Sequence, residues 1–313
     1  MTTMSWTPVN DAMDFVLAKT IPSFKVDEFR FSTDLPFGQQ HICVLACVSY
    51  LIIVLGGREL MKAYKPFTLK QLVFVHNVIM SAGSLLLWIL VLEQVVPMMF
   101  NNGFTYTMCN RAAYSPRLEF LYYLNYIFKL WEFIDTIFLV LKKRPLEFLH
   151  VYHHSATAAF AYLFLWKPIS SAWVVLVLNL AVHVLMYYYY AVSTVSKRQI
   201  WWKKHLTTMQ IVQFVLDIAM LAFMTYNVFI NEYFVWVKDY GFKTVPGCYA
   251  ADPVTQASVS AVLFGSYLIL FIDFYSKTYK RDAAKRAASK KSAVNGNGYP
   301  ADATSSNGIT KEE

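Results

Sequence analysis

The chain has 313 residues, of which 57% are hydrophobic, 17% are aromatic and 15% are charged, and its mean hydropathy is +0.38. This composition is too apolar for a protein dissolved in water and is typical of a protein embedded in a lipid bilayer. The formal net charge of +8 arises from short basic clusters between apolar stretches, so no nucleic-acid-binding face is expected. We therefore predict an all-α integral membrane protein.

Seven apolar stretches follow an N-terminal segment, residues 1–40, whose first five residues lack the basic and apolar regions of a signal peptide. Each stretch is long enough to cross about 30 Å of hydrocarbon as a helix of roughly 17 to 25 residues. In chain order, the predicted spans are residues 41–57, 71–96, 118–141, 148–166, 171–192, 206–230 and 254–276. The sequence thus predicts a membrane domain of seven transmembrane helices over residues 41–276.

Lysine and arginine gather in alternate loops of this bundle, in particular in residues 58–70, 142–144 and 197–204. Because basic loops remain in the cytosol, the N-terminal segment is predicted to be lumenal and the C-terminus to be cytosolic. Residues 277–313 carry basic pairs followed by Asn, Gly, Ser and Thr, and have too little apolar content to fold. We expect them to form a disordered basic cytosolic tail.

The four cysteines fall into two pairs. Cys43 and Cys47 lie inside the first span, where they are expected to act as small apolar packing residues. Cys109 and Cys248 lie in two loops on the predicted lumenal side. An oxidising lumen permits a disulfide between them, and the sequence leaves two free thiols open as the alternative.

Ionisable residues occur in the third and fourth spans, where each costs about 2.5 to 3.5 kcal/mol on insertion and usually marks a functional site. One helical face of the third span carries Lys129, Glu132, Asp135 and Thr136. The fourth span carries, at positions i, i+3 and i+4, the residues His150, His153 and His154. These three imidazoles project from one face toward a common point. A structural ion-pair network is the alternative for the third-span charges.

Polar residues also occur at one end of the fifth and sixth spans. The fifth span ends with Asn179, His183, Met186, Tyr187 and Tyr190, and the sixth begins with Thr207, Gln210, Gln213 and Asp217. Taken alone, they fit a core histidine, an interfacial aromatic belt and interhelical hydrogen bonds. However, all four motifs lie within about 15 Å of the same predicted membrane boundary, at 1.5 Å per helical residue. We therefore predict a polar pocket that opens toward the cytosol, above an apolar chamber for a long apolar substrate.

At these positions the chain resembles the ELO family of very-long-chain fatty acid elongases, and in particular its fungal-type members. The family motifs KxxExxDT and HxxHH are present as Lys129, Glu132, Asp135 and Thr136, and as His150, His153 and His154. The motifs HxxMYxYY and TxxQxxQ are present as His183, Met186, Tyr187, Tyr189 and Tyr190, and as Thr207, Gln210 and Gln213. Four short motifs in series within seven apolar spans make this resemblance specific.

The resemblance implies a multi-pass protein of the endoplasmic reticulum membrane, in which six of the seven helices enclose a tunnel for the acyl chain. The implied reaction is the condensing step of fatty acid elongation, in which acyl-CoA and malonyl-CoA give 3-oxoacyl-CoA, CO2 and CoA without a cofactor or metal. The implied partners are the two CoA substrates, the bilayer, and the ketoreductase, dehydratase and enoyl reductase of the elongation cycle. A homo-oligomer is left open.

The resemblance favours His153 as the nucleophile, because a neutral imidazole can attack a thioester and form a reactive acyl-imidazole. No cysteine lies in the predicted cytosolic polar layer. The residues expected to orient groups, move protons, stabilise the enolate or fix imidazole tautomers are His150, His154, His183, Glu132 and Asp135. Basic residues expected to attract the CoA phosphates are Lys129, Lys142, Lys143, Arg144, Lys203 and Lys204. Further substrate-binding candidates are Thr136, Asn179, Met186, Tyr187, Tyr190, Thr207, Gln210 and Gln213.

Two other protein classes share parts of this pattern. Membrane desaturases and hydroxylases also contain HxxHH boxes, but their di-iron centre needs roughly eight histidines, and this chain has seven histidines and one box. A single zinc ion on the histidine triad is geometrically conceivable but less expected. A seven-span receptor or transporter accounts for the span count but not for a histidine triad beside a charged helix, and no inverted repeat is visible.

Overall fold

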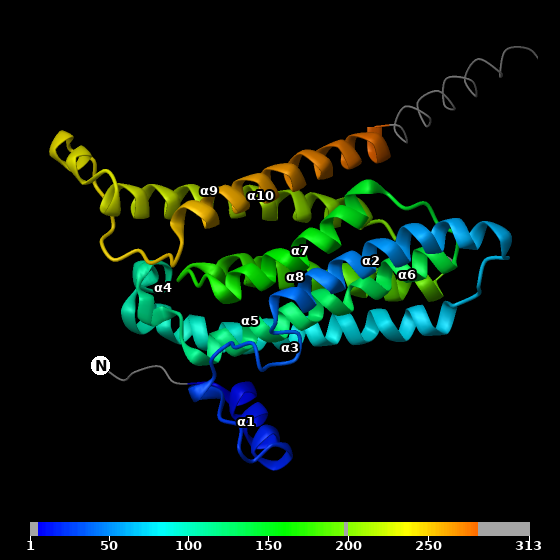
Figure 1. The fold of residues 1–313 in the computed structure, drawn as a ribbon, viewed down its shortest axis with the longest axis horizontal. Coiled ribbons are helices and arrows are strands. Elements are labelled where there is room, and N and C mark those ends of the chain that lie inside the picture. The colour runs from blue at the N-terminus through cyan, green and yellow to red at the C-terminus, as the bar shows by residue number, and fades with distance from the viewer. Residues whose placement is uncertain (1–5, 197–199, 281–313) are drawn as a thin grey trace, which may run out of the picture. The chain divides into compact units, whose positions relative to one another are not determined.

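The computed structural model describes residues 6–196 and 200–280, and in these ranges it is all-helical with no β-strand (Figure 1). The predicted fold class is therefore confirmed as all-α. The chain divides into one compact unit over residues 1–271 and a second over residues 272–313. Most of the predicted tail, residues 281–313, lies outside the described residues.

Within the described residues, five helices are long and apolar enough to cross a membrane by length and composition. They are α2 (Gln40–Leu60), α3 (Lys70–Asn102), α8 (Ala172–Val195), α9 (Lys203–Glu232) and α10 (Pro253–Tyr275). The third and fourth predicted spans correspond to α5 (Pro116–Trp131) with α6 (Phe133–Leu141), and to α7 (Phe148–Trp166). The chain is therefore a multi-pass membrane protein, and the crossing of all seven segments stays a prediction.

The third predicted span is interrupted at Glu132, which separates α5 from α6. Glu132 keeps helical torsions, with φ −58° and ψ −17°, and the Asp135 amide donates to its carbonyl oxygen at 3.1 Å. A bond to the third preceding residue is the tighter 3₁₀ pattern, which often marks a functional position within a helix. The junction lies inside the charged motif, between Lys129 on α5 and Asp135 on α6.

The two ends of the helical bundle have different chemistry. At the basic end, residues 142–147 connect α6 to α7. At the disulfide end, Cys109 is bonded to Cys248. Between these ends, α3 and α9 both pack along α8, α5 packs against α7, and α2 packs against α6 and α7. This arrangement brings the first turns of α7 and α9 and the last turns of α6 and α8 to the basic end.

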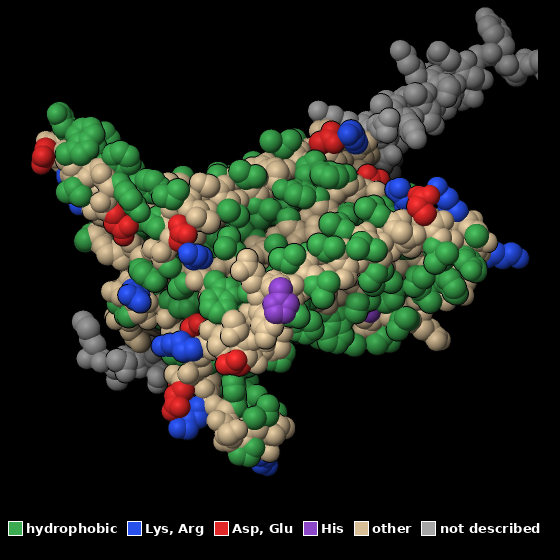
Figure 2. All heavy atoms as spheres, in the orientation of Figure 1, with side chains coloured by type: hydrophobic (Ala, Val, Ile, Leu, Met, Phe, Trp, Pro, Cys, Tyr) green, Lys and Arg blue, Asp and Glu red, His purple; other side chains and the backbone are tan. Residues whose placement is uncertain are grey.

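Large apolar side chains cover the outer faces of the helices, while the charged groups lie mainly toward their ends (Figure 2). Examples are Ile52 on α2, which is 66% exposed, and Val262 on α10, which is 69% exposed. Removal of such a side chain from water is worth about 1.5 to 3 kcal/mol. A bilayer supplies this burial, in agreement with the membrane-embedded class that the composition predicts.

The N-terminal segment contains α1 (Pro8–Thr20), which is anchored on α3 by Glu93. The Glu93 carboxylate accepts hydrogen bonds from the backbone amides of Val9 and Asn10 at 2.8 to 3.1 Å, and from the Asn10 side-chain amide at 2.9 Å. The free N–H groups and the dipole of a helix N-terminus both favour a carboxylate. Glu93 therefore has a structural role, far from the polar motifs in sequence.

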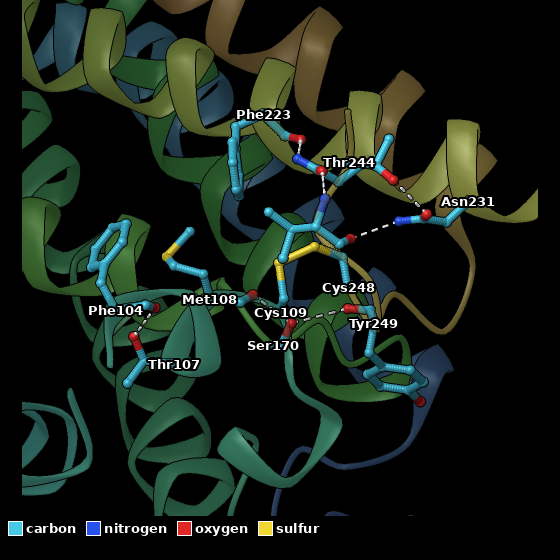
Figure 3. The surroundings of a disulfide bond; sticks show 12 residues. Phe104, Thr107, Met108, Cys109, Ser170, Phe223, Asn231, Thr244, Cys248 and Tyr249 are labelled. Carbon is cyan, nitrogen blue, oxygen red and sulfur yellow. Dashed lines mark hydrogen bonds between the residues drawn. A yellow bond between two sulfur atoms is a disulfide. The ribbon is translucent and has the colours of Figure 1, made fainter. Parts of the chain in front are cut away.

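At the disulfide end, Cys109 closes α4 (Phe104–Cys109) and is bonded to Cys248, 139 residues later (Figure 3). The Tyr249 amide donates to the Cys109 carbonyl oxygen at 2.9 Å. The Ser170 hydroxyl, from the connection between α7 and α8, donates to the carbonyl oxygen of Met108 at 2.6 Å. The structure thus contains the bridge that the sequence permits, and hydrogen bonds join the connected loops around it.

The second unit begins within α10 and continues as η5 (Ser276–Lys280), a single turn of π-helix. Within this unit the Lys277 ammonium lies 2.6 Å from the Asp273 carboxylate. Residues 277–280, which were predicted to begin a disordered tail, are therefore helical. The remainder of that prediction falls on residues that the structure does not describe.

Candidate active site

A cavity of about 130 Å³ lies inside the first unit, surrounded by α5, α7, α8, α9 and α10. Most of its lining is apolar and includes Phe160, Phe164, Leu176, Met220 and Leu263. Its polar lining includes Lys129, His153, Asn179, Gln213 and Asp217. Residues from all four sequence motifs or their neighbours thus meet around one mainly apolar chamber, while a tunnel enclosed by six helices stays a prediction.

Glu132 is the centre of a buried charge cluster, and it is 2% exposed. One carboxylate oxygen accepts from the Lys129 ammonium at 2.9 Å and lies 3.2 Å from His183 Nδ1. The other oxygen lies 3.8 Å from His154 Nδ1. The Lys129 ammonium also donates to the Asn179 side-chain oxygen at 2.8 Å. Lys129 and Glu132 come from α5 and its junction with α6. The other partners come from α7, which carries His154, and from α8, which carries Asn179 and His183.

This cluster is the arrangement that a buried ion pair requires. Buried charges are tolerated when they are paired and their remaining lone pairs and protons are hydrogen-bonded. The carboxylate also faces a nitrogen of each histidine, so it can hold those rings in one orientation. The expected tautomer-fixing role of Glu132 is therefore geometrically available toward His183, at 3.2 Å, more directly than toward His154.

Asp135 connects three helices through hydrogen bonds. Its Oδ1 atom lies 2.7 Å from Nε2 of His76 on α3, and its Oδ2 atom accepts from the Tyr187 hydroxyl on α8 at 2.6 Å. His76 is 7% exposed and Tyr187 is fully buried. Both carboxylate oxygens are therefore used to hold α3 and α8 against α6.

Thr136, the next residue, connects α6 to the histidine motif. Its hydroxyl lies 3.0 Å from Nε2 of His150 and 2.9 Å from the hydroxyl of Tyr50 on α2. The Tyr50 ring stacks on Phe133 with centroids 4.2 Å apart. His150 therefore has its Nε2 atom held from outside the histidine motif, while its ring lies 4.3 Å from that of His154.

His153 is the histidine of the triad that lines the cavity. Its ring lies 4.8 Å from that of Tyr267 on α10, and the Tyr267 hydroxyl donates to its backbone carbonyl oxygen at 3.2 Å. Among the described residues, no side chain forms a hydrogen bond or ion pair with its imidazole. Both ring nitrogens of His153 therefore remain available for chemistry in the chamber.

The remaining predicted residues lie around rather than in the chamber. Gln210 donates to the Met186 sulfur at 3.6 Å, which joins α9 to α8. Tyr190 is 42% exposed and packs beside Tyr187, with ring centroids 6.3 Å apart. The first turns of α9, at the basic end, carry Lys203, Lys204 and Thr207. The two lysines are exposed and Thr207 is buried. None of these seven residues lines the cavity.

Three residues of this network were not identified as site residues from the sequence, namely Tyr50, His76 and Tyr267. His76 carries the signal that could have found it, because it is an ionisable residue within a predicted span and near the same boundary as the four motifs. Tyr50 and Tyr267 carry no such signal, since tyrosine is common in this chain. In the part of the chain that the structure describes, no three His, Cys, Asp or Glu side chains are grouped as a metal site requires.

Comparison with known proteins agrees with the motifs. The ELO profile, described as the GNS1/SUR4 family, matches residues 35–287. A Schizosaccharomyces pombe protein named "Putative fatty acid elongase 2" is 37% identical over 291 residues, which cover 92% of this chain and 76% of that protein. The same yeast's "Putative fatty acid elongase 1" is 39% identical over 256 residues, which cover 80% of this chain and 73% of that protein.

A mammalian relative also matches most of the chain, at a lower identity. "Very long chain fatty acid elongase 2" of Rattus norvegicus is 31% identical over 277 residues, which cover 85% of this chain and 90% of that protein. The profile match spans the predicted membrane domain. The two yeast relatives are more similar to this chain than the rat relative is, as the fungal-type resemblance predicts. The chain belongs to the ELO family, also described as the GNS1/SUR4 family.

Proposed function

We propose that this chain is a fatty acid elongation enzyme that catalyses the condensing step, in which acyl-CoA and malonyl-CoA give 3-oxoacyl-CoA, CO2 and CoA. The names of the relatives support fatty acid elongation as the process. The observation that carries the proposal is the position of His153, whose unbonded imidazole lines a mainly apolar chamber together with the Lys129 ammonium. A nucleophile at the polar wall of a mainly apolar chamber suits acyl transfer.

In the first half-reaction, a nitrogen of His153 attacks the carbonyl carbon of the acyl thioester. The carbon–sulfur bond breaks, CoA leaves as the thiolate, and the proton lost from the imidazole neutralises it. The acyl group is then bonded to His153 as an acyl-imidazole, which is reactive enough to pass it on. The Lys129 ammonium lines the same chamber and can stabilise the negative oxygen that develops during the attack.

In the second half-reaction, malonyl-CoA loses CO2, and the electron pair of the broken carbon–carbon bond forms the enolate of acetyl-CoA. The enolate carbon attacks the acyl-imidazole, a new carbon–carbon bond forms, and His153 leaves and takes up one proton. Glu132 holds His183 and Lys129, so we assign it an orienting role. His150, His154 and His183 are the proposed groups for proton movement and enolate stabilisation, and Asp135 is proposed to position α3 and α8 through His76 and Tyr187.

The proposed surroundings follow from the two ends of the bundle. We propose that the basic end faces the cytosol of an endoplasmic reticulum membrane, that residues 1–40 are lumenal, and that the exposed Lys203 and Lys204 attract CoA phosphates. Thr136, Asn179, Met186, Tyr187, Tyr190, Thr207, Gln210 and Gln213 are the proposed wall around the CoA arm and the first acyl carbons. The product of this step suits a ketoreductase, dehydratase and enoyl reductase as partners in the cycle.

Intact-protein mass spectrometry tests the proposal directly. We expect the purified full chain to gain the mass of one acyl group when it is incubated with acyl-CoA, and to lose it with release of 3-oxoacyl-CoA when malonyl-CoA is added. His153→Ala is expected to show neither adduct nor product, whereas His41→Ala, a change of an exposed histidine at the start of α2, is expected to show both. An adduct on the His153→Ala variant would remove the nucleophile assignment, and a wild-type protein that leaves malonyl-CoA intact would remove the reaction.

A further inference from the structure

Three residues that line the cavity each carry a buried, unpaired polar atom, and the proposed condensation chemistry does not use these atoms. They are Oδ1 of Asp217 on α9, and the Tyr122 hydroxyl and Asn125 Oδ1 on α5. We call these three residues the polar belt. Each atom is buried, and within residues 6–196 and 200–280 none has a hydrogen-bond partner. A saturated acyl chain offers them nothing, since methylene groups neither donate nor accept hydrogen bonds.

Asp217 is the most exceptional member of the belt, because it is a carboxyl group with 1% exposure in an apolar chamber. Its Oδ2 atom accepts from the Gln213 side chain at 3.3 Å, and its Oδ1 atom is buried without a hydrogen-bond partner. The ion pairs of the described chain do not include it. A buried polar group left unsatisfied is costly, so such a group in a native chamber calls for a ligand that satisfies it.

The belt lies beyond the reactive residues, toward the disulfide end. Asn125 precedes Lys129 by four residues on α5, and Asp217 follows Gln213 by four residues on α9, which runs in the opposite direction. Four helical residues correspond to about 6 Å along each axis. With the thioester carbonyl at His153, the belt therefore faces the acyl chain a few carbons beyond the carbonyl group.

We infer that the polar belt is a subsite for a hydroxyl group on the acyl chain, so that the enzyme accepts hydroxyacyl-CoA substrates whose hydroxyl lies a few carbons from the thioester. A hydroxyl group donates one hydrogen bond and accepts others, which matches the acceptors of Asp217 and Asn125 and the phenolic donor of Tyr122. This inference rests on the proposed condensation and specifies one class of acyl substrate for it. The geometry assigns Asp217 as the specificity-determining residue.

A competition assay with the full-length enzyme in lipid nanodiscs tests this subsite. A saturated acyl-CoA and a hydroxyacyl-CoA of equal chain length compete for malonyl-CoA, and the ratio of the two 3-oxoacyl-CoA products gives the ratio of their kcat/KM values. The hydroxyl is moved one carbon at a time away from the thioester through a substrate series. The ratio is the readout because a general loss of active enzyme cancels from it.

For the wild type, we expect the ratio of kcat/KM for the hydroxyacyl-CoA to kcat/KM for the saturated acyl-CoA to be higher at one or two hydroxyl positions than at the neighbouring positions. Asp217→Leu is expected to lower the ratio at those positions by about 10-fold, and Asp217→Asn, which keeps an acceptor oxygen, is expected to retain most of it. Tyr122→Phe, which removes a single oxygen atom, provides a second test in case the leucine variant does not fold. The matched control is Met220→Leu, an apolar exchange on the same helix in the same cavity, for which the ratio is expected to stay within about twofold.

Two results overturn the inference in distinguishable ways. The subsite does not exist, and the belt holds water only, if the kcat/KM ratio of the wild type is the same at every hydroxyl position. The same conclusion follows if Asp217→Leu and Tyr122→Phe leave the ratio unchanged. Failure of the proposed condensation is seen separately, because the saturated acyl-CoA then gives no 3-oxoacyl product with the wild-type enzyme.

Discussion

Replacement of Glu132 by glutamine is the sharpest test of how this site is held together. The Glu132 and Lys129 side chains are each 3% exposed, and the carboxylate lies 2.9 Å from the ammonium and between His154 and His183. Glutamine keeps the size of the side chain but removes its charge, so the ammonium stays buried with Asn179 as its remaining oxygen partner. Breaking a buried ion pair by removing one partner costs about 3 to 5 kcal/mol.

We therefore expect Glu132→Gln to lower the free energy of unfolding by about 3 to 5 kcal/mol. At about 1.4 kcal/mol per tenfold, this shifts the unfolding equilibrium by roughly 10²- to 10³-fold. Lys129→Met in the same chain removes the stranded ammonium, so the double variant is expected to be less destabilised than the sum of the two single variants, by about 1 to 3 kcal/mol.

Reversible denaturation of the purified protein in mixed micelles measures all four members of this cycle. Glu59→Gln is the matched control, because Glu59 also pairs with a lysine three residues away, Lys62, but is 53% exposed. An exposed pair contributes about 0 to 1 kcal/mol, so this control is expected to change stability by less than about 1 kcal/mol. Equal losses for Glu132→Gln and Glu59→Gln, or strictly additive losses within the cycle, would contradict a stabilising buried ion pair between Glu132 and Lys129.

Three further predictions concern contacts outside the charge cluster. Loss of the disulfide in the Cys109→Ser/Cys248→Ser variant, which opens a loop of 139 residues, is expected to lower the free energy of unfolding by about 2 to 5 kcal/mol. A reducing agent should shift thermal unfolding of the wild type and not of this variant, and an unshifted wild type contradicts the role of the bridge. Glu93→Ala is expected to weaken the anchoring of α1 by about 1 to 2 kcal/mol, seen as faster amide hydrogen exchange over residues 8–20. Glu28→Ala, a change of an exposed glutamate, is the control and is expected to leave this exchange unchanged. Unchanged exchange in Glu93→Ala would argue against the role of the Glu93 carboxylate at the N-terminus of α1. Tyr50→Phe removes the hydroxyl that bonds Thr136 beside His150, and elongation is expected to fall about fivefold, the equivalent of one net hydrogen bond of about 1 kcal/mol. Tyr64→Phe, a change of an exposed tyrosine, is the comparison, and equal rates for both variants would remove Tyr50 from the network.

The helical elements and the membrane class were predictable from local sequence. Apolar stretches of membrane-spanning length locate helices because a backbone in lipid has to satisfy its own hydrogen bonds. The helical period then places Lys129, Glu132 and Asp135 on one side and aligns the three histidines, so their approach could be predicted without a structure. The motifs also identified the family, which the comparisons confirm.

Contacts between helices could not be predicted in the same way. His76 bonds Asp135 across 59 residues, Tyr50 bonds Thr136 across 86 residues, and His153 alone of the triad lines the cavity. Such contacts depend on the rotation and depth of each helix against its neighbours. In a chain whose helices are apolar on nearly every face, hydrophobic periodicity does not specify that rotation, because lipid and protein interior are similarly apolar. The sequence therefore determined which polar groups the membrane domain contains, and close packing of α2, α3 and α5 to α10 decided which of them meet.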